Sequence, residues 1–230
     1  MPEAELTILA GGGIAAPLDD IVARFERARD QRVVARYGTL PQLIDMARGG
    51  IPFELAVVPR DVLDDPAVRA LIVPSSIRTV ARVGIGVAIR QGQPTPDIST
   101  PDALKRTLLA ATGVASIPAS ATGARIAEIY ARLGIVDEMV PRTRPQPTPK
   151  QIVEAVAAGD AELGLFGLNV LIDPRLAIVG PVPAELQRDV VYDLALAANA
   201  STPDAARAFI AHLLSPAARE VIRQMGMHPG

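Results

Sequence analysis

Short apolar runs alternate with amphipathic segments along the first third of the chain. Residues 6–10 read LTILA, an apolar run typical of a buried strand, and they lead into three glycines. The next segment, 17–27, carries apolar residues at the three- and four-residue spacing of one helix face. The alternation continues with strands at 31–38 and 53–59 and helices at 40–48 and 61–71. This order predicts a parallel sheet with helices on its faces.

A second block with the same alternation lies between two long apolar segments, 82–90 and 189–199. Its predicted elements are strands at 113–118 and 161–167 and helices at 101–109, 123–133 and 149–158. Two further helices, opened by Pro203 and Pro216, close the chain. The fold class predicted is α/β with two lobes, each a mostly parallel sheet with flanking helices, joined by two crossing strands.

The order of the elements also predicts where the lobes divide. Lobe 1 is expected to comprise residues 1–82 plus 190–230, and lobe 2 residues 83–189. Pockets favour positions between such lobes, so a ligand cleft is expected there.

Composition excludes several classes of function. The chain has 230 residues, of which 49% are apolar, and a net charge of −2, so it can bury a large core but lacks the basic excess of a nucleic-acid-binding protein. There is no Cys, and the two histidines, His212 and His228, are too few for a multi-histidine zinc site. We therefore expect no metal and no cofactor. His212 lies on a helical segment, at a partly buried or surface face, and is not expected to be catalytic, and Tyr192 is the stronger polar candidate near the crossing strands.

The pattern of hydrophobic residues also bears on location. No apolar run reaches the roughly 18 residues that a membrane span needs, so no membrane span is expected. The first residues lack the basic start and long apolar stretch of a signal peptide. The protein is expected to be cytoplasmic as the sequence stands, or periplasmic if the chain is a trimmed mature form.

Glycines and hydroxyl residues between predicted strands and helices indicate anion-binding loops. Gly11–Gly13 connect the first strand to the first helix, and similar connections occur at Tyr37–Thr39 and Ser120–Gly123. The first turn of a helix offers unpaired N–H groups and a partial positive charge, which together favour a bound anion. A dinucleotide fingerprint is not present, because Ala16 stands where its third glycine would be. Arg125, in the first turn of its helix, can reach a bound carboxylate.

The order of these segments resembles the type II periplasmic solute-binding proteins, in particular the molybdate-binding branch. The resemblance rests on LTILAGGGIAAPLDDIVARFE, YGTLPQLIDMARGGIPFELAVVP, AVAAGDAELGLFG and VYDLALAAN. The segments RTVARVGIGVAIRQGQPTPDIST, ARLGIVDEMVP and GPVPAELQ are similar to a side branch that includes aconitate isomerase. The resemblance covers essentially the whole chain.

The resemblance implies four ligand loops. Carried over by position, they are Gly12, Gly13 and Ile14; Thr39 and Leu40; Ser120, Ala121, Thr122 and Gly123; and Gly167, Leu168 and Asn169. The first loop has no hydroxyl, whereas molybdate binders usually place a serine there. A carboxylate and an inorganic oxyanion therefore both stay open as ligands. The acidic position Glu54 is implied to be structural.

Two functions from different classes are consistent with this reading. The first is binding of a di- or tricarboxylate or an inorganic oxyanion, with delivery to an ABC permease if the protein is exported. The second is isomerisation of a small unsaturated carboxylate, which needs a base, and none of the four loops contains an Asp, Glu, His or Lys. Whether the protein is an enzyme is left open. A cytoplasmic ligand sensor is a third possibility, although it would need a separate DNA-binding partner.

Overall fold

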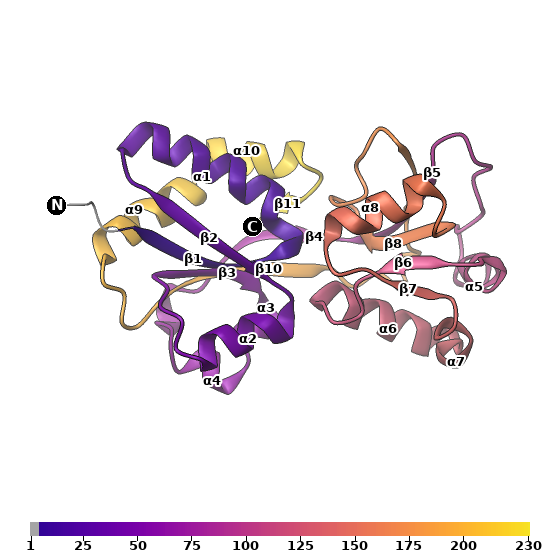
Figure 1. The fold of residues 1–230 in the computed structure, drawn as a ribbon, viewed down its shortest axis with the longest axis horizontal. Coiled ribbons are helices and arrows are strands. Elements are labelled where there is room, and N and C mark those ends of the chain that lie inside the picture. The colour runs from indigo at the N-terminus through magenta and orange to yellow at the C-terminus, as the bar shows by residue number, and fades with distance from the viewer. Residues whose placement is uncertain (1–4) are drawn as a thin grey trace. The chain divides into compact units, whose positions relative to one another are not determined.

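The computed structural model describes residues 5–230 (Figure 1). The expectation about a signal peptide rests partly on residues 1–4, which lie outside the described residues. The chain divides into two compact units, one running to Arg82 and resuming at Val191–Gly230, the other formed by Val83–Val190. The backbone therefore passes between the units twice.

The first unit is built on a six-stranded sheet in the order β11-β4-β10-β3-β1-β2. Its strands are β1 (Leu6–Gly11), β2 (Val33–Gly38), β3 (Leu55–Pro59), β4 (Arg78–Val83), β10 (Val190–Leu196) and β11 (His228–Pro229). β1 runs parallel to both β2 and β3, while β10 is antiparallel to β3. The predicted parallel sheet is confirmed for the first three strands, and the antiparallel strands come from the part of the chain that returns late in the sequence.

Helices cover both faces of this sheet (Figure 1). Those of the first unit are α1 (Ala15–Arg29), α2 (Leu40–Arg48), α3 (Arg60–Leu63), α4 (Pro66–Arg69), α9 (Pro203–Leu213) and α10 (Pro216–Gln224), with short 3-10 turns η1 (Gly12–Ile14) and η2 (Pro74–Ser76). α1 packs beside α9 and α10, and α2 packs beside α3 and α4. His212, on α9, packs against aromatic side chains, since its ring lies 5.4 Å from that of Phe25 and 6.5 Å from that of Phe209.

The second unit is built on a five-stranded sheet in the order β7-β6-β8-β5-β9. Its elements are β5 (Ile85–Arg90), α5 (Pro101–Ala110), β6 (Val114–Ser116), α6 (Ala121–Leu133), α7 (Val136–Met139), β7 (Thr143–Pro145), α8 (Pro149–Ala158), β8 (Leu163–Gly167) and β9 (Leu176–Pro181). β6 is parallel to β7 and β8, and β5 is antiparallel to β8 and β9. One continuous apolar core contains buried side chains from every strand except β7.

Two of the predicted elements are wrong in detail. The apolar segment 82–90 is not one strand, because Gly84 separates β4 from β5. The predicted helix 61–71 is two short helices, α3 and α4. The break comes at Asp65, whose carboxylate caps α4 by accepting bonds from the N–H groups of Ala67 and Val68, and at Pro66, which cannot continue a helix from the preceding turn.

Glu54 is one of the few buried charged residues, with 6% of its surface exposed. Its Oε2 accepts a bond from the backbone N–H of Thr7 at 2.8 Å, and its Oε1 accepts one from the hydroxyl of Ser201 at 2.8 Å. The carboxylate thus joins the start of β1 to the loop before α9. This geometry agrees with the structural role that the resemblance implied.

Replacement of Glu54 by alanine is expected to lower the free energy of unfolding by about 2–4 kcal/mol, because it leaves a buried N–H without a partner and opens a cavity. Urea denaturation followed by circular dichroism measures this loss. Ser201→Ala, which removes a single neutral partner, is the matched control and should lose about 1 kcal/mol. Equal effects of the two variants would contradict the central role given to the carboxylate.

Candidate functional site

The first two predicted ligand loops lie at one edge of the first sheet. β1 and β2 are parallel and end in register, with Gly11 opposite Gly38. Gly12–Ile14 form the 3-10 turn η1 directly after β1, and Thr39 follows β2. Because the carboxyl ends of neighbouring parallel strands meet at the same edge, the structure brings these loops together within the first unit. The N-termini of α1 and α2 lie there too.

The glycines of the first loop are required by close packing against Tyr192. An alanine Cβ built at Gly13 would overlap the Tyr192 hydroxyl, and one at Gly11 would lie 2.9 Å from both Pro59 Cδ and Tyr192 Cε1. Tyr192 lies on β10, next to the point where the chain enters the first unit, and it is 3% exposed. Its burial raises the pKa of the phenol, so the hydroxyl stays protonated beside the loop.

Thr39 begins α2 with a reciprocal cap. The side chain of Gln42 accepts bonds from the backbone N–H of Thr39 at 2.8 Å and from its hydroxyl at 3.0 Å. Leu40 is the first residue of the helix and is half-buried. In this arrangement the Thr39 hydroxyl, which was predicted to contact a ligand, donates its hydrogen bond to Gln42.

A carboxylate that sequence reasoning did not identify stands beside these two loops. Tyr37, the residue before Gly38, donates its hydroxyl to Asp19 Oδ1 at 2.5 Å. Asp19 is exposed and lies in the second turn of α1, whereas Tyr37 is half-buried. Burial, followed by the bond to Asp19, raises the pKa of Tyr37. The only signal in the sequence was an acidic residue one turn after the glycine loop.

The third and fourth predicted loops lie at one edge of the second sheet. β6 and β8 are parallel neighbours; β6 leads into Ser120 and α6, and β8 leads into Leu168 and Asn169. Their carboxyl ends therefore meet at the same edge, as those of β1 and β2 do in the first unit. The predicted ligand residues thus lie in two neighbouring loops within each unit.

Ser120 is the N-cap of α6, as the sequence indicated. Its hydroxyl accepts a bond from the N–H of Gly123 at 2.9 Å and donates to the carbonyl of Ile117 at 2.7 Å. Ala121 and Thr122 are buried in the first turn of the helix. Arg125 is paired with Glu128 at 2.7 Å, with 27% of its side chain exposed.

The fourth loop is anchored by Leu168. Its backbone N–H donates to the carbonyl of Gly84 at 3.0 Å, and its side chain occupies the space that a Cβ would need at Gly86. Asn169 folds back so that its Oδ1 lies 2.9 Å from a Cβ built on Gly167. The structure thus assigns Leu168 to packing and leaves Gly167 and Asn169 at the edge of the sheet.

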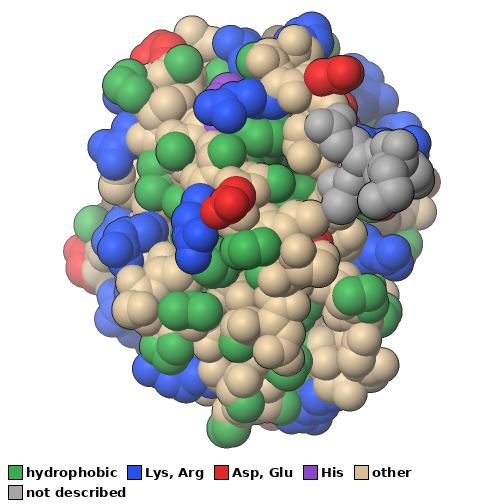
Figure 2. All heavy atoms as spheres, turned by 90° about the vertical axis from the view of Figure 1, so that its left-hand side faces the viewer, with side chains coloured by type: hydrophobic (Ala, Val, Ile, Leu, Met, Phe, Trp, Pro, Cys, Tyr) green, Lys and Arg blue, Asp and Glu red, His purple; other side chains and the backbone are tan. Residues whose placement is uncertain are grey.

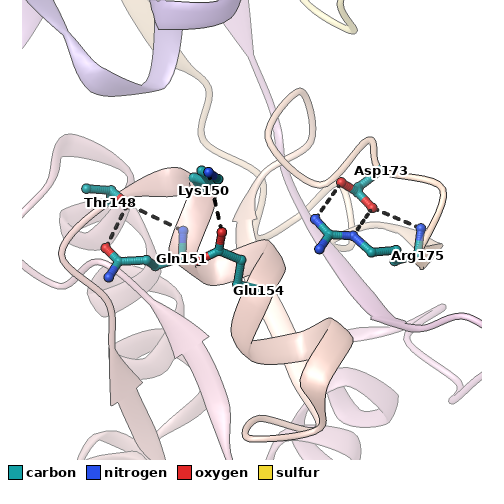
Figure 3. Close-up of polar contacts among 6 residues, drawn as sticks. All are labelled: Thr148, Lys150, Gln151, Glu154, Asp173 and Arg175. Carbon is teal, nitrogen blue, oxygen red and sulfur yellow. Dashed lines mark hydrogen bonds and ion pairs between the residues drawn. The ribbon is translucent and has the colours of Figure 1, made fainter.

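A further loop at the same edge was not identified from the sequence. β7 is parallel to β6, and Gln146, just after it, donates its N–H to the carbonyl of Ser116 at 2.8 Å. α8 then begins at Thr148, whose hydroxyl donates to Gln151 Oε1 at 2.8 Å, as Figure 3 shows. Its proline-rich sequence indicated only an irregular segment, because the short strand β7 carries no clear period.

Ion pairs around this loop are also visible in Figure 3. Lys150, in the first turn of α8, lies 3.6 Å from Glu154, and its side chain is 83% exposed. Asp173 and Arg175 form a two-pronged pair at 2.8 and 3.0 Å, and the bonds from Arg175 lower the pKa of Asp173. The second pair closes the segment that leads from the fourth loop to β9.

Arg60 links three strands of the first sheet. It follows β3, and its guanidinium donates to both carboxylate oxygens of Asp193 on β10 at 2.7 and 3.2 Å and to the hydroxyl of Thr79 on β4 at 3.3 Å. Asp193 is 1% exposed, so its charge depends on this bidentate partner. The residues that carry the chain into and out of the first unit are thus fixed to β3.

Other candidate sites can be compared with these loops. Within residues 5–230, no three His, Asp or Glu side chains gather closely enough to hold a metal ion. A groove of about 440 Å³ lies in the second unit between Thr95–Ser99 and Val179–Ala184, and none of the predicted ligand residues lines it. No helix among the described residues combines the length and hydropathy needed to cross a bilayer. On the face of the molecule in Figure 2, basic side chains are spread among apolar and acidic ones.

The family of the chain follows from comparison with known proteins. A profile of the family described as bacterial extracellular solute-binding protein matches residues 6–228. The chain belongs to this family, which confirms the resemblance seen in the sequence. It is 30% identical over 236 residues to a Pseudomonas protein named aconitate isomerase, with 99% of this chain and 89% of the relative covered. It is 23% identical to the molybdate-binding protein ModA of Azotobacter vinelandii, covering 97% and 89% of the two chains.

Solved structures show the same fold. The periplasmic molybdate-binding protein of Azotobacter vinelandii superposes with a TM-score of 0.81 at 17% identity, covering 98% of this chain and 99% of the other. The sulfate-binding protein SubI of Mycobacterium tuberculosis gives a TM-score of 0.79 at 16% identity, covering 99% and 87%. The predicted α/β class of the two-lobed periplasmic binding proteins is confirmed.

Proposed function

We propose that this protein binds a small anion, either a di- or tricarboxylate or an inorganic oxyanion, as the substrate-binding component of an ABC-type uptake system. The observation that carries the proposal is the pairing of glycine and hydroxyl loops at the carboxyl edge of each parallel sheet. In each unit two such loops lead into helices or turns. An anion held by such loops would receive several backbone N–H groups without a metal.

The comparisons support an anion as the ligand. Relatives and structural neighbours are named as molybdate-binding and sulfate-binding proteins. The family is described as extracellular, which favours binding of the ligand outside the cytoplasmic membrane and its delivery to a permease. The first loop of this chain, Gly12–Ile14, offers no hydroxyl, so backbone groups would make its contacts.

A second candidate is isomerisation of a small unsaturated carboxylate. The relative at 30% identity is named aconitate isomerase. Moving a double bond next to a carboxylate needs a base that removes a proton and donors that stabilise the resulting charge. The loops offer donors, and the carboxylate of Asp19 beside the first two loops is a candidate for the base.

A ligand of the proposed kind is expected to raise the melting temperature by about 5–10 °C when present at a hundred times its dissociation constant. The measurement is a thermal-shift screen against molybdate, tungstate, sulfate, phosphate and a panel of di- and tricarboxylates, with sodium chloride at equal ionic strength as the control. Each stabilising ligand is then incubated with the protein and followed by proton NMR. An unchanged spectrum supports the binding protein and conversion to an isomer supports the enzyme. No stabilisation by any anion would contradict both.

A further inference from the structure

Asp19 differs from its neighbour Asp20 in how its charge is balanced. Asp20 is paired with Arg24 at 2.8 Å, one turn further along α1. The helix positions three and four residues to either side of Asp19 are Ala15, Ala16, Val22 and Ala23, none of which is a cation. The one hydrogen-bond partner of Asp19 among the described residues is the neutral phenol of Tyr37, on Oδ1. The carboxylate therefore has no cationic partner at these helix positions, and Tyr37 occupies Oδ1 rather than Oδ2.

The position of this carboxylate places it close to the predicted anion loops. Asp19 is the fifth residue of α1, about 7.5 Å along the axis from the end of the Gly12–Ile14 turn. Side chains on a helix lean towards its N-terminus, which here is the side of that turn. Tyr37 holds the carboxylate from β2, one residue before Gly38 and two before Thr39. The bond from Tyr37 thus ties the carboxylate to the end of β2, next to the second loop.

A fixed negative charge beside an anion site has a definite chemical consequence. It repels a ligand that offers only negative oxygen atoms, and it accepts a hydrogen bond from a ligand that carries a hydroxyl or a protonated oxygen. Because Tyr37 already occupies Oδ1, the carboxylate cannot turn away from the loops without losing that bond.

We propose that Asp19, positioned by Tyr37, makes the site select anions that carry a hydrogen-bond donor, namely hydroxylated carboxylates or protonated oxyanions. This inference rests on the proposed function and deepens it, because it divides the possible ligands by chemistry. It favours L-malate over succinate, citrate over tricarballylate, and hydrogen phosphate over sulfate. In each pair the two members are similar in size and differ in the donor.

The test is calorimetric titration of the wild type, Asp19→Asn and Asp20→Asn with these three pairs at pH 7.5. In the wild type the donor-bearing member of at least one pair should bind at least about tenfold more tightly than its partner, as expected for a hydrogen bond to a charged group. Asp19→Asn keeps an acceptor for Tyr37 but removes the charge, so this ratio should fall towards one and the ligand without a donor should gain about threefold. Asp20→Asn makes the same change of charge one residue away and should keep the wild-type ratio.

A second variant separates charge from position. Tyr37→Phe retains the charge of Asp19 but releases the carboxylate, so it should lower the preference for the donor-bearing ligand without improving the binding of sulfate. The inference is overturned if the wild type shows no preference for the donor-bearing member in any of the three pairs, or if Asp19→Asn leaves the ratio unchanged. Failure of the wild type to bind any anion would overturn the proposed function together with this inference.

Discussion

Replacing Gly123 with alanine is expected to destabilise the second unit by about 3 kcal/mol or more, although alanine is the better helix former by about 1 kcal/mol. Gly123 is the third residue of α6. A Cβ there would lie 2.7 Å from the carbonyl carbon of Pro118 and closer still to the carbonyl oxygens of Ile117 and Pro118. All three atoms belong to the backbone of the third loop, so no side chain can move aside. Either the loop or the start of the helix must shift.

Thermal denaturation measures this effect, with an expected fall in melting temperature of about 6–12 °C for a chain of this size. The matched control is Gly113→Ala in the same unit, where the nearest atom is Cγ of the exposed Arg144 side chain, at 3.2 Å, and no backbone atom lies closer than 3.6 Å. That variant should change the stability by less than about 1 kcal/mol. An increase in stability for Gly123→Ala would show that helix propensity outweighs the contact with the loop.

Gly13→Ala is expected to lower the stability by about 2–3 kcal/mol, and a second change, Tyr192→Phe, is expected to restore most of that loss. The Tyr192 hydroxyl occupies the place that a Cβ at Gly13 would take, whereas the next atom of the ring, Cζ, lies at 3.4 Å, an ordinary contact. Removing one oxygen atom therefore makes room for one methyl group. The backbone of Gly13 has no positive φ, so alanine itself is tolerated there.

A double-mutant cycle measured by urea denaturation tests this compensation. The control is Gly11→Ala, whose Cβ would meet the Tyr192 ring and Pro59 Cδ, both at 2.9 Å. Those atoms remain in Tyr192→Phe, so the stability lost in Gly11→Ala should not be restored by that second change. Additive effects of Gly13→Ala and Tyr192→Phe would mean that the hydroxyl does not limit the space beside the first loop. Titration of the stable double variant with a ligand found in the thermal-shift screen would then show whether the loop needs glycine for binding as well as for packing.

These two predictions bear on function because Gly13 and Gly123 belong to the predicted ligand loops. In each case the glycine serves the approach of another part of the chain: the ring of Tyr192 in one loop and the backbone at Ile117–Pro118 in the other. A reduced affinity in a variant that has lost stability would not identify a ligand contact. The restored double variant at Gly13 avoids this difficulty, since it alters the loop while keeping the fold.

The helices and strands that have a strong local signal could be predicted from the sequence alone. The apolar run before Gly11 and the helix starts at Pro203 and Pro216 are local features, since a strand or a helix start depends on residues a few positions apart. The order of these signals was enough to predict the α/β class and the family. The four ligand loops were implied by the family resemblance and remain a prediction.

Contacts between segments far apart in the sequence could be identified only in the folded structure. The pairing of Tyr37 with Asp19, the fit of Tyr192 against Gly13, the tie between Arg60 and Asp193 and the bond from Gln146 to Ser116 each join residues that no local pattern connects. Gly84, which divides one long apolar segment into β4 and β5, looked like any glycine in a strand until the sheets were assembled. Hydrophobic periodicity records which face of an element is buried, but it does not record which partner covers that face. That choice is made by the packing of the whole sheet, which places the phenol of Tyr37 against the carboxylate of Asp19.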